Sequence, residues 1–141
     1  MTARRAAALG RLDDPQLGLE AGLAADDHLA LRLWLRLLAC SNQIGTEIRR
    51  RLRARHGITL SRFDYLAQLH RHPEGLRMNT LSRHLMVTGG NVTGLTDELE
   101  KEGLVQRQAM PGDRRAILLR LTAAGRAAFE RIAAEHESWV I

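Results

Sequence analysis

The sequence of 141 residues has little cysteine, few aromatic side chains and almost no lysine. Its single cysteine, Cys40, excludes a disulfide within the chain and with it the class of disulfide-rich secreted scaffolds. No uninterrupted apolar run reaches the length of a membrane span, and Arg4, Arg5 and Arg11 interrupt any signal-like start. We therefore expect a cytoplasmic protein that has no membrane partner.

Motifs for catalysis and for metal or phosphate binding are also missing. No serine lies in a nucleophile-elbow context, and no phosphate loop occurs. His70 and His72 have no cysteine or carboxylate cluster at zinc spacing beside them, which favours a solvated pair over a metal site. Cys40 falls on a largely apolar surface, which favours a packed thiol over a redox switch. We expect neither an enzyme nor a bound metal or cofactor.

Charge and hydrophobicity indicate one folded domain with a basic surface. Hydrophobic residues make up 45% of the chain and charged residues 26%, which argues against disorder. Arginine and lysine total 21 against 16 acidic residues, and Lys101 is the only lysine. The planar guanidinium group suits phosphates and base edges, so an anionic partner is favoured. A general arginine bias of the genome would produce the same composition.

A long helix is predicted over residues 26–56, after an N-terminal extension of residues 1–25 that is partly ordered at best. Asp26 or Asp27 would cap this helix, and Gly57 would end it. Its first half is apolar on nearly every side, which a helix tolerates only when more than one side is buried. In so small a chain this predicts an interface between subunits. The apolar positions are Leu29, Leu31, Leu33, Trp34, Leu35, Leu37, Leu38 and Cys40.

A polar stripe of His28, Arg32 and Arg36 runs along one side of the same apolar segment. An anion pocket and an ion pair between subunits are both open interpretations of this stripe. The second half of the helix carries arginines all around its circumference, which indicates a solvated helix end favoured by the helix dipole.

Two further helices are predicted before residue 86. The first follows the capping pattern Ser61-x-x-Asp64 and ends before Pro73, and residues 72–78 then leave room for one short strand. The second is capped by Asn79. Its inward positions are Leu81 and Leu85, and its outward position is Arg83.

The next helix, predicted between an N-cap at Thr88 and a left-handed C-cap at Gly103, has a bare start. Gly89, Gly90 and Gly94 lie there, although each glycine inside a helix costs about 1 kcal/mol relative to alanine. Small residues let backbone N–H groups approach an anionic partner closely; the alternative is a loop beside a short helix. Replacing Gly94 by alanine should then raise stability and weaken any binding at this face. The apolar positions of the helix are Val92, Leu95 and Leu99.

A basic hairpin is predicted after this helix. Val105–Ala109 and Ala116–Leu121 alternate in polarity and are joined by a Pro-Gly-Asp turn. Thr122 would cap a last helix that runs to the chain end. Two short helices joined by a tight turn and followed by such a hairpin form a winged helix-turn-helix, in which one helix enters the major groove of DNA and the hairpin reaches the adjacent minor groove.

This arrangement assigns contacts with DNA. Gly89, Gly90 and Gly94 would let the recognition helix point its N-terminus at the duplex. Asn91 and Thr93 would bond base edges or phosphates. The arginines that would hold phosphates are Arg83 and Arg77.

Residues 61–139 resemble the MarR family of winged-helix transcription regulators. The resemblance is carried by LSRHLMVTGGNVTGLTDELEKEGLV, by the wing motif PGDRRAILLRLT and by AAGRAAF. It implies an α+β fold, mainly α with a small β-hairpin wing, in which dimerisation helices flank the winged helix-turn-helix. Within a single domain of residues 26–141, the expected parts are dimerisation helices 26–56 and 122–141, and a winged helix-turn-helix 61–121 with its wing at 105–121.

The same resemblance implies a function and roles for wing residues. We expect a homodimeric, sequence-specific repressor that binds a pseudo-palindromic operator in double-stranded DNA and is released by a small aromatic or anionic ligand. Asp113 would orient Arg115 into the minor groove, with Arg114 at the neighbouring phosphates. Asp97 and Glu98 stand where many relatives keep a basic residue, so the second half of the recognition helix should bind phosphates poorly.

Further expectations concern the ligand and the dimer contacts. The candidates for an effector pocket are His28, Arg32 and Arg36. The family usually adds a further C-terminal helix, whereas this chain stops at HESWVI. Two interpretations are open: the true C-terminus lies beyond this sequence, or the N-terminal extension and the helix with Trp34 carry more of the dimer contact.

Two alternatives belong to other functional classes. One is an architectural DNA-binding protein of low sequence preference, and the other is a winged helix that binds proteins. The arginines at the wing tip argue against the second. A high ratio of operator affinity to random-DNA affinity would exclude the first.

Overall fold

The computed structural model describes residues 29–85 and 91–140, which divide into two units at residue 50. The first unit contributes residues 29–50, the larger part of helix α2 (Leu29–His56). Gly57 ends α2 in the left-handed conformation, with a φ of 61°, as predicted. None of the described helices has the length and apolar character of a membrane span. The extension of residues 1–25, the predicted caps Asp26 and Asp27, and His28 lie outside the described residues.

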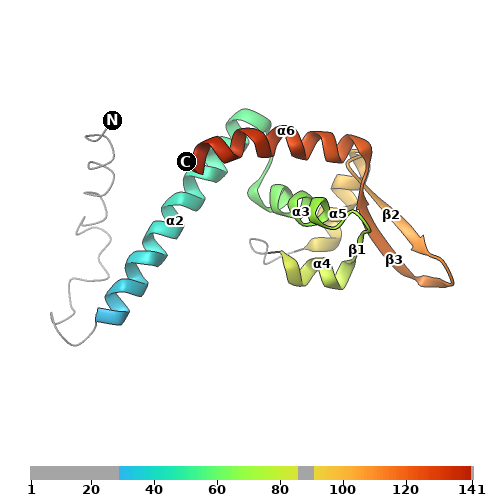
Figure 1. The fold of residues 1–141 in the computed structure, drawn as a ribbon, viewed down its shortest axis with the longest axis horizontal. Coiled ribbons are helices and arrows are strands. Elements are labelled where there is room, and N and C mark those ends of the chain that lie inside the picture. The colour runs from blue at the N-terminus through green and yellow to red at the C-terminus, as the bar shows by residue number, and fades with distance from the viewer. Residues whose placement is uncertain (1–28, 86–90, 141) are drawn as a thin grey trace. The chain divides into compact units, whose positions relative to one another are not determined.

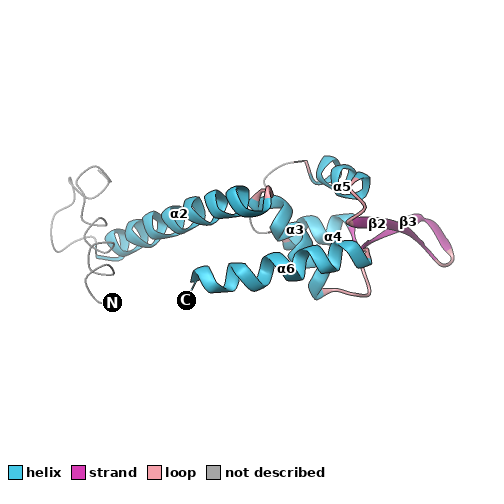
Figure 2. Ribbon diagram, turned by 90° about the horizontal axis from the view of Figure 1, so that it is seen from above, coloured by secondary structure: helices cyan, strands magenta, loops and turns pink. Residues whose placement is uncertain are grey.

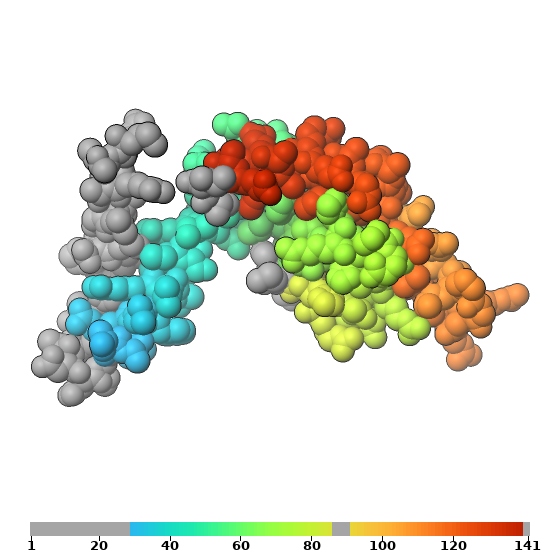
Figure 3. Space-filling view, in the orientation of Figure 1, coloured from blue at the N-terminus to red at the C-terminus, as the bar shows by residue number. Residues whose placement is uncertain are grey.

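The second unit is a small three-stranded sheet with helices packed against it (Figure 1). The strands pair antiparallel in the order β1-β3-β2, and the β2–β3 hairpin extends away from the helices (Figures 1 and 2). Figure 3 shows its tip as a projection beyond the neighbouring helices. The elements are α3 (Leu60–Arg71), β1 (Leu76–Arg77), α4 (Met78–His84), α5 (Val92–Lys101), β2 (Val105–Met110), β3 (Asp113–Leu121) and α6 (Ala123–Val140). This is the mainly helical fold with a hairpin wing that the sequence predicts.

The core of the second unit lies between α3, α4, α5, α6 and the sheet. Phe63 of α3 stacks on Phe129 of α6 with ring centroids 5.4 Å apart. As predicted, Leu81 of α4 and Leu85, the C-cap of this helix, are buried and Arg83 is exposed. Burial of these apolar side chains supplies the main stabilising contribution. The largest fully buried apolar side chains are Tyr65, Leu52, Leu66, Leu69, Leu81, Leu99, Leu119 and Val105.

Helix α3 begins earlier than predicted. Thr59 has the extended backbone that an N-cap requires, and its hydroxyl accepts a hydrogen bond from the Arg62 amide at 3.2 Å. The prediction that Ser61 caps the helix is therefore wrong. Asp64, predicted to complete the capping pattern, is instead buried, and its carboxylate accepts from the Gln68 side chain at 3.3 Å.

The predicted cap of α4 is also wrong. Strand β1 ends at Arg77, whose extended backbone turns directly into the helix at Met78, so no separate capping residue fits between the two elements. Asn79 consequently lies inside the first turn. Its side-chain oxygen accepts from the Thr80 hydroxyl at 3.4 Å.

The base of the hairpin is tied to the start of α6. Thr122 caps α6 as predicted, because its hydroxyl oxygen accepts from the Gly125 amide at 3.0 Å, and the same hydroxyl donates to the Gly103 carbonyl at 2.6 Å. A Cβ at Gly125 would lie 1.9 Å from the Leu104 carbonyl oxygen. Only glycine allows the helix to approach the hairpin base this closely.

Candidate nucleic-acid interface

The recognition helix α5 begins at Val92 and is capped by Asn91, so the predicted N-cap at Thr88 is wrong. The Asn91 side-chain oxygen accepts from the Gly94 amide at 2.8 Å, which satisfies one of the exposed donors at the helix start. Asn91, predicted to bond DNA, therefore already uses one of its side-chain atoms within the helix. Thr88, Gly89 and Gly90 lie outside the described residues.

Gly94 leaves space for this cap. A Cβ at Gly94 would lie 2.4 Å from Nδ2 and 2.8 Å from Cγ of Asn91, so alanine would displace the capping side chain. This contact opposes the expected rise in stability, because the gain in helix propensity is offset by loss of the cap. Thr93, the other predicted polar contact, is exposed on the same turn.

The buried face of α5 contains a polar contact that the sequence did not indicate. Thr96 is fully buried, and its hydroxyl donates to the Val92 carbonyl at 2.8 Å. The single Thr96 proton is then used, so the Tyr65 hydroxyl is the donor in the 2.7 Å bond between these two side chains. Burial raises the pKa of Tyr65 to about 12. This bond joins α3 to the recognition helix α5 and fixes which face of α5 turns outward.

The outward face of α5 carries acidic residues that bind the wing. Asp97 and Glu100 both contact the Arg107 guanidinium of β2, with 2.8 Å between Nη1 and the Glu100 carboxylate. The hydrogen bond that Arg107 donates to the Asp97 carboxylate is the main cause of a raised pKa of Arg107. The sequence shows that Asp97 and Glu98 are acidic. It does not reveal Arg107 as the partner of Asp97, because the two residues lie ten positions apart on different elements.

Exposed arginines occupy the tip of the wing. The Pro111–Gly112 turn places Gly112 at a φ of 83°, and β3 starts at Asp113. The pairs Ala109–Ile117 and Met110–Asp113 leave residues 114–116 without a direct partner, which is a bulge in the ladder.

The predicted pairing at the wing tip acts through the backbone. The Asp113 carboxylate accepts from the backbone amide of Arg115 at 3.0 Å, which shapes the bulge. Both Arg114 and Arg115 are exposed. Their guanidinium groups therefore extend from a constrained tip.

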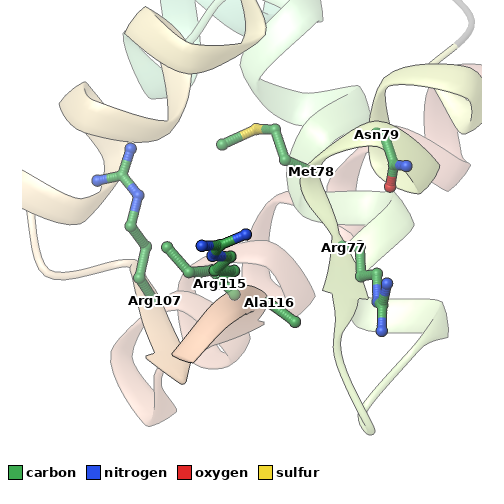
Figure 4. Close-up of a pocket in the computed structure, with 7 residues that line it drawn as sticks. Arg77, Met78, Asn79, Arg107, Arg115 and Ala116 are labelled. Atoms are coloured by element: carbon green, nitrogen blue, oxygen red, sulfur yellow. The ribbon is translucent and has the colours of Figure 1, made fainter. Parts of the chain in front are cut away.

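A hollow of 340 Å³ lies between the start of α4 and the wing (Figure 4). Two of the predicted DNA contacts, Arg77 and Arg115, line it, whereas Arg83 lies elsewhere on the exposed side of α4. Arg77 reaches back to the wing, where Nη2 lies 3.5 Å from the Met110 sulfur. The full lining is Arg77, Met78, Asn79, Arg107, Arg115, Ala116 and Ile117.

The histidines near the end of α3 bind separate carboxylates. His70 lies 3.1 Å from Glu130 and His72 lies 3.1 Å from Glu74, so each of these partly exposed histidines has its own carboxylate partner. Across the described residues, no three histidine, cysteine or acidic side chains are placed to hold a metal.

The predicted effector residues and the thiol belong to the first unit. Arg32 and Arg36 lie on α2, and their role in a pocket stays a prediction. Cys40 is half-buried on the same helix.

Comparison with known proteins identifies the family. A family model described as the MarR family matches residues 58–117. The crystal structure of a MarR family transcriptional regulator from Silicibacter pomeroyi is 34% identical, with a TM-score of 0.68 over 82% of this chain and 79% of that one. The chain belongs to the MarR family. The matched residues extend from the segment before α3 to the middle of β3 and include the MarR winged helix-turn-helix with most of its wing.

Two further MarR-type proteins are similar to this chain. The transcriptional activatory protein BadR of Rhodopseudomonas palustris is 35% identical over 108 residues, which are 75% of this chain and 61% of BadR. This chain thus spans less than two thirds of the length of BadR. Sco3205 of Streptomyces coelicolor, a MarR family regulator solved in complex with DNA, is 25% identical, with a TM-score of 0.69 over 84% of this chain and 72% of Sco3205. These proteins are named as regulators of transcription, which agrees with the expectation that the chain is not an enzyme.

Proposed function

We propose that this MarR-family chain is a homodimeric, sequence-specific regulator that binds a pseudo-palindromic operator in double-stranded DNA. The observation that carries the proposal is the wing tip, where exposed Arg114 and Arg115 extend from a hairpin tied to the recognition helix. A guanidinium group in a narrow minor groove gains from the enhanced negative potential there. The crystal structure of Sco3205 bound to DNA supports double-stranded DNA as the partner.

In this proposal α5 enters the major groove with its N-terminal turn toward the bases. Thr93 and the exposed amide of Asn91 bond bases or phosphates, while Gly94 keeps the first turn narrow. Arg115 enters the adjacent minor groove. The phosphate contacts come from Arg77, Arg83 and Arg114. Thr88, Gly89 and Gly90, which precede α5 in the sequence, are further proposed DNA contacts.

The first test concerns the wing. An operator would be selected from random DNA with the wild-type protein, and binding would then be titrated at one fixed salt concentration. Arg115→Ala should weaken specific binding by roughly 1 to 3 kcal/mol, and more than Arg114→Ala, which should lower affinity for all sequences alike. Equal and small effects of the two substitutions would contradict the wing assignment. A wild-type protein with little preference for the selected DNA would instead support the architectural alternative.

The dimer is supported by the apolar surface of α2 in the first unit. Its exposed large side chains are too many for a helix in contact with water alone, because contiguous apolar patches of this kind mark interfaces. Leu37, for example, is 60% exposed. The exposed apolar residues of this surface are Leu29, Leu31, Leu33, Trp34, Leu37, Leu38 and Ile44.

Sedimentation at micromolar concentration tests the dimer. The wild-type chain should sediment as a dimer, and Leu37→Asp should dissociate it because a carboxylate at the centre of an apolar interface is left without a partner. Gln43→Asp is the matched control, since Gln43 is an exposed polar residue on the same helix. A monodisperse wild-type monomer, or equal effects of the two substitutions, would contradict the assignment.

Repression and release by a small aromatic or anionic ligand complete the proposal. His28, Arg32 and Arg36 are the candidate ligand contacts, because a polar stripe on an apolar helix can bind an anionic group. Transcription from a promoter that contains the selected operator should fall when the protein is added and recover with an aromatic acid. Increased transcription would identify an activator, the activity for which BadR is named. Protection of the operator that no member of a panel of aromatic acids reverses would contradict the ligand response.

A further inference from the structure

Arg107 is bound three times by two acidic residues of the recognition helix. Its Nη1 lies 2.8 Å from Glu100 Oε1, its backbone amide donates to Glu100 Oε2 at 3.2 Å, and its Nη2 pairs with Asp97. Asp97 and Glu100 are one helical turn apart on α5, so one guanidinium group can bind both. Figure 4 shows the Arg107 side chain rising from the wing into the hollow between wing and helices.

The position of Arg107 in the sheet makes this network a link between two DNA-reading elements. Arg107 pairs with Leu119 in the wing stem, which we define as the paired residues 105–109 and 117–121. The stem continues directly into the bulge that carries Arg115. A fixed contact between the stem and α5 therefore fixes the distance between the helix in one groove and the guanidinium in the next.

Two simpler roles of the network would have different consequences for DNA binding. Asp97 and Glu100 are 61% and 41% exposed, and an exposed ion pair adds little to stability. If the network were only a surface ion pair, its removal would alter operator affinity only through the change in net charge. If Arg107 were itself a phosphate contact, its loss would weaken binding to every DNA sequence.

We propose that Arg107 is a positioning residue, which Asp97 and Glu100 hold so that the recognition helix and the wing reach their two grooves in register. The proposal rests on the operator binding described above. It assigns a role to acidic residues on a surface where negative charge would otherwise only repel phosphates. Arg107 acts through Arg115 rather than by a contact of its own.

Substitution of the two acidic residues provides a test, because affinity for random DNA and affinity for the operator should change in opposite directions. The double variant Asp97→Asn with Glu100→Gln removes negative charge next to DNA, so its affinity for random DNA should rise. Its affinity for the operator should fall, because the wing stem is no longer bound to α5. Glu98→Gln is the matched control: it lies on the same helix, is exposed, and has no ion pair among the described residues. It should strengthen binding to both DNAs alike.

A double-mutant cycle separates positioning from direct contact. Arg107→Gln should weaken operator binding by about the same factor as Arg115→Ala, roughly 5- to 100-fold. Combined with Arg115→Ala it should have almost no further effect, since the contact that it positions is already gone. Arg107→Lys should recover part of the affinity, because the ammonium group keeps the charge but cannot bind both carboxylates in the same planar geometry.

The outcomes distinguish the proposals. Thermal melting of every variant identifies those that remain folded at the titration temperature. Additive effects of Arg107→Gln and Arg115→Ala, or tighter operator binding by the acidic double variant, would overturn the positioning role while leaving operator binding intact. A wild-type protein that does not prefer the selected operator would overturn the proposed function, and the positioning role with it.

Discussion

Replacing Gly94 by alanine should leave the free energy of unfolding almost unchanged, although alanine is the better helix former. In the helix interior this exchange stabilises by about 1 kcal/mol. The new Cβ would lie 2.8 Å from Cγ of Asn91, so the Asn91 side chain must rotate away and lose its hydrogen bond to the Gly94 amide. Loss of an N-cap costs about 1 kcal/mol, and the two effects therefore cancel.

The cancellation is measurable because it disappears when the cap is absent. In an Asn91→Gly background no side chain opposes the new methyl group, and glycine is itself tolerated at an N-cap. Gly94→Ala should then stabilise by the full amount of about 1 kcal/mol. Urea unfolding of the four proteins of this cycle gives the coupling directly. A stabilisation of about 1 kcal/mol by Gly94→Ala in the wild-type background would refute the steric argument, since it would mean that Asn91 moves without loss.

Three further predictions concern the packing of the second unit. Gly125→Ala should destabilise the protein by about 3 kcal/mol in urea unfolding, because its Cβ would meet the Leu104 backbone, and only a shift of backbone relieves that contact. Tyr65→Phe should cost about 1 kcal/mol by removing the bond to Thr96. The pKa of Tyr65 is raised to about 12 from an ordinary value of 10.0. The protonated phenol therefore contributes its full stability below about pH 10, and this contribution is lost as the pH rises toward 12. The stability of Tyr65→Phe should not fall in this way over the same pH range. Burial lowers the pKa of His136 below its ordinary value of 6.5, so the stability that it contributes is present above pH 6.5 and falls as the pH drops further; His136→Phe should reduce this acid loss in thermal melts.

The elements of the winged helix-turn-helix could be predicted where local chemistry decides them. Leu81 and Leu85 recur at helical spacing and are buried, the first within α4 and the second as its C-cap. Gly57 and Gly103 end their helices with positive φ, where glycine has little steric cost. Thr122 caps α6 through its own hydroxyl. In each case the residues that determine the structure lie within four positions of one another.

Contacts between elements could not be read from the sequence. Thr96 lies between Leu95 and Leu99 in the apolar stripe, but its burial depends on a tyrosine in another helix that donates to it. The partner of Asp97 and Glu100 lies across a turn, on a strand whose register sets the distance. The predicted caps of α3 and α5 were wrong because more than one residue near the start of each helix has a side chain suitable for capping. The predicted cap of α4 was wrong because the extended backbone of β1 continues directly into the helix.

The contact of Gly125 with the Leu104 carbonyl also limits how this chain can change during evolution. A substitution at that position meets backbone rather than a side chain, so no compensating replacement of a neighbouring residue can accommodate it. The positive-φ glycines Gly57, Gly103 and Gly112 have open space around them, and asparagine is an accessible substitute there. We therefore expect neutral drift in related sequences to alter these turns repeatedly while glycine persists at the junction of α6 with the wing.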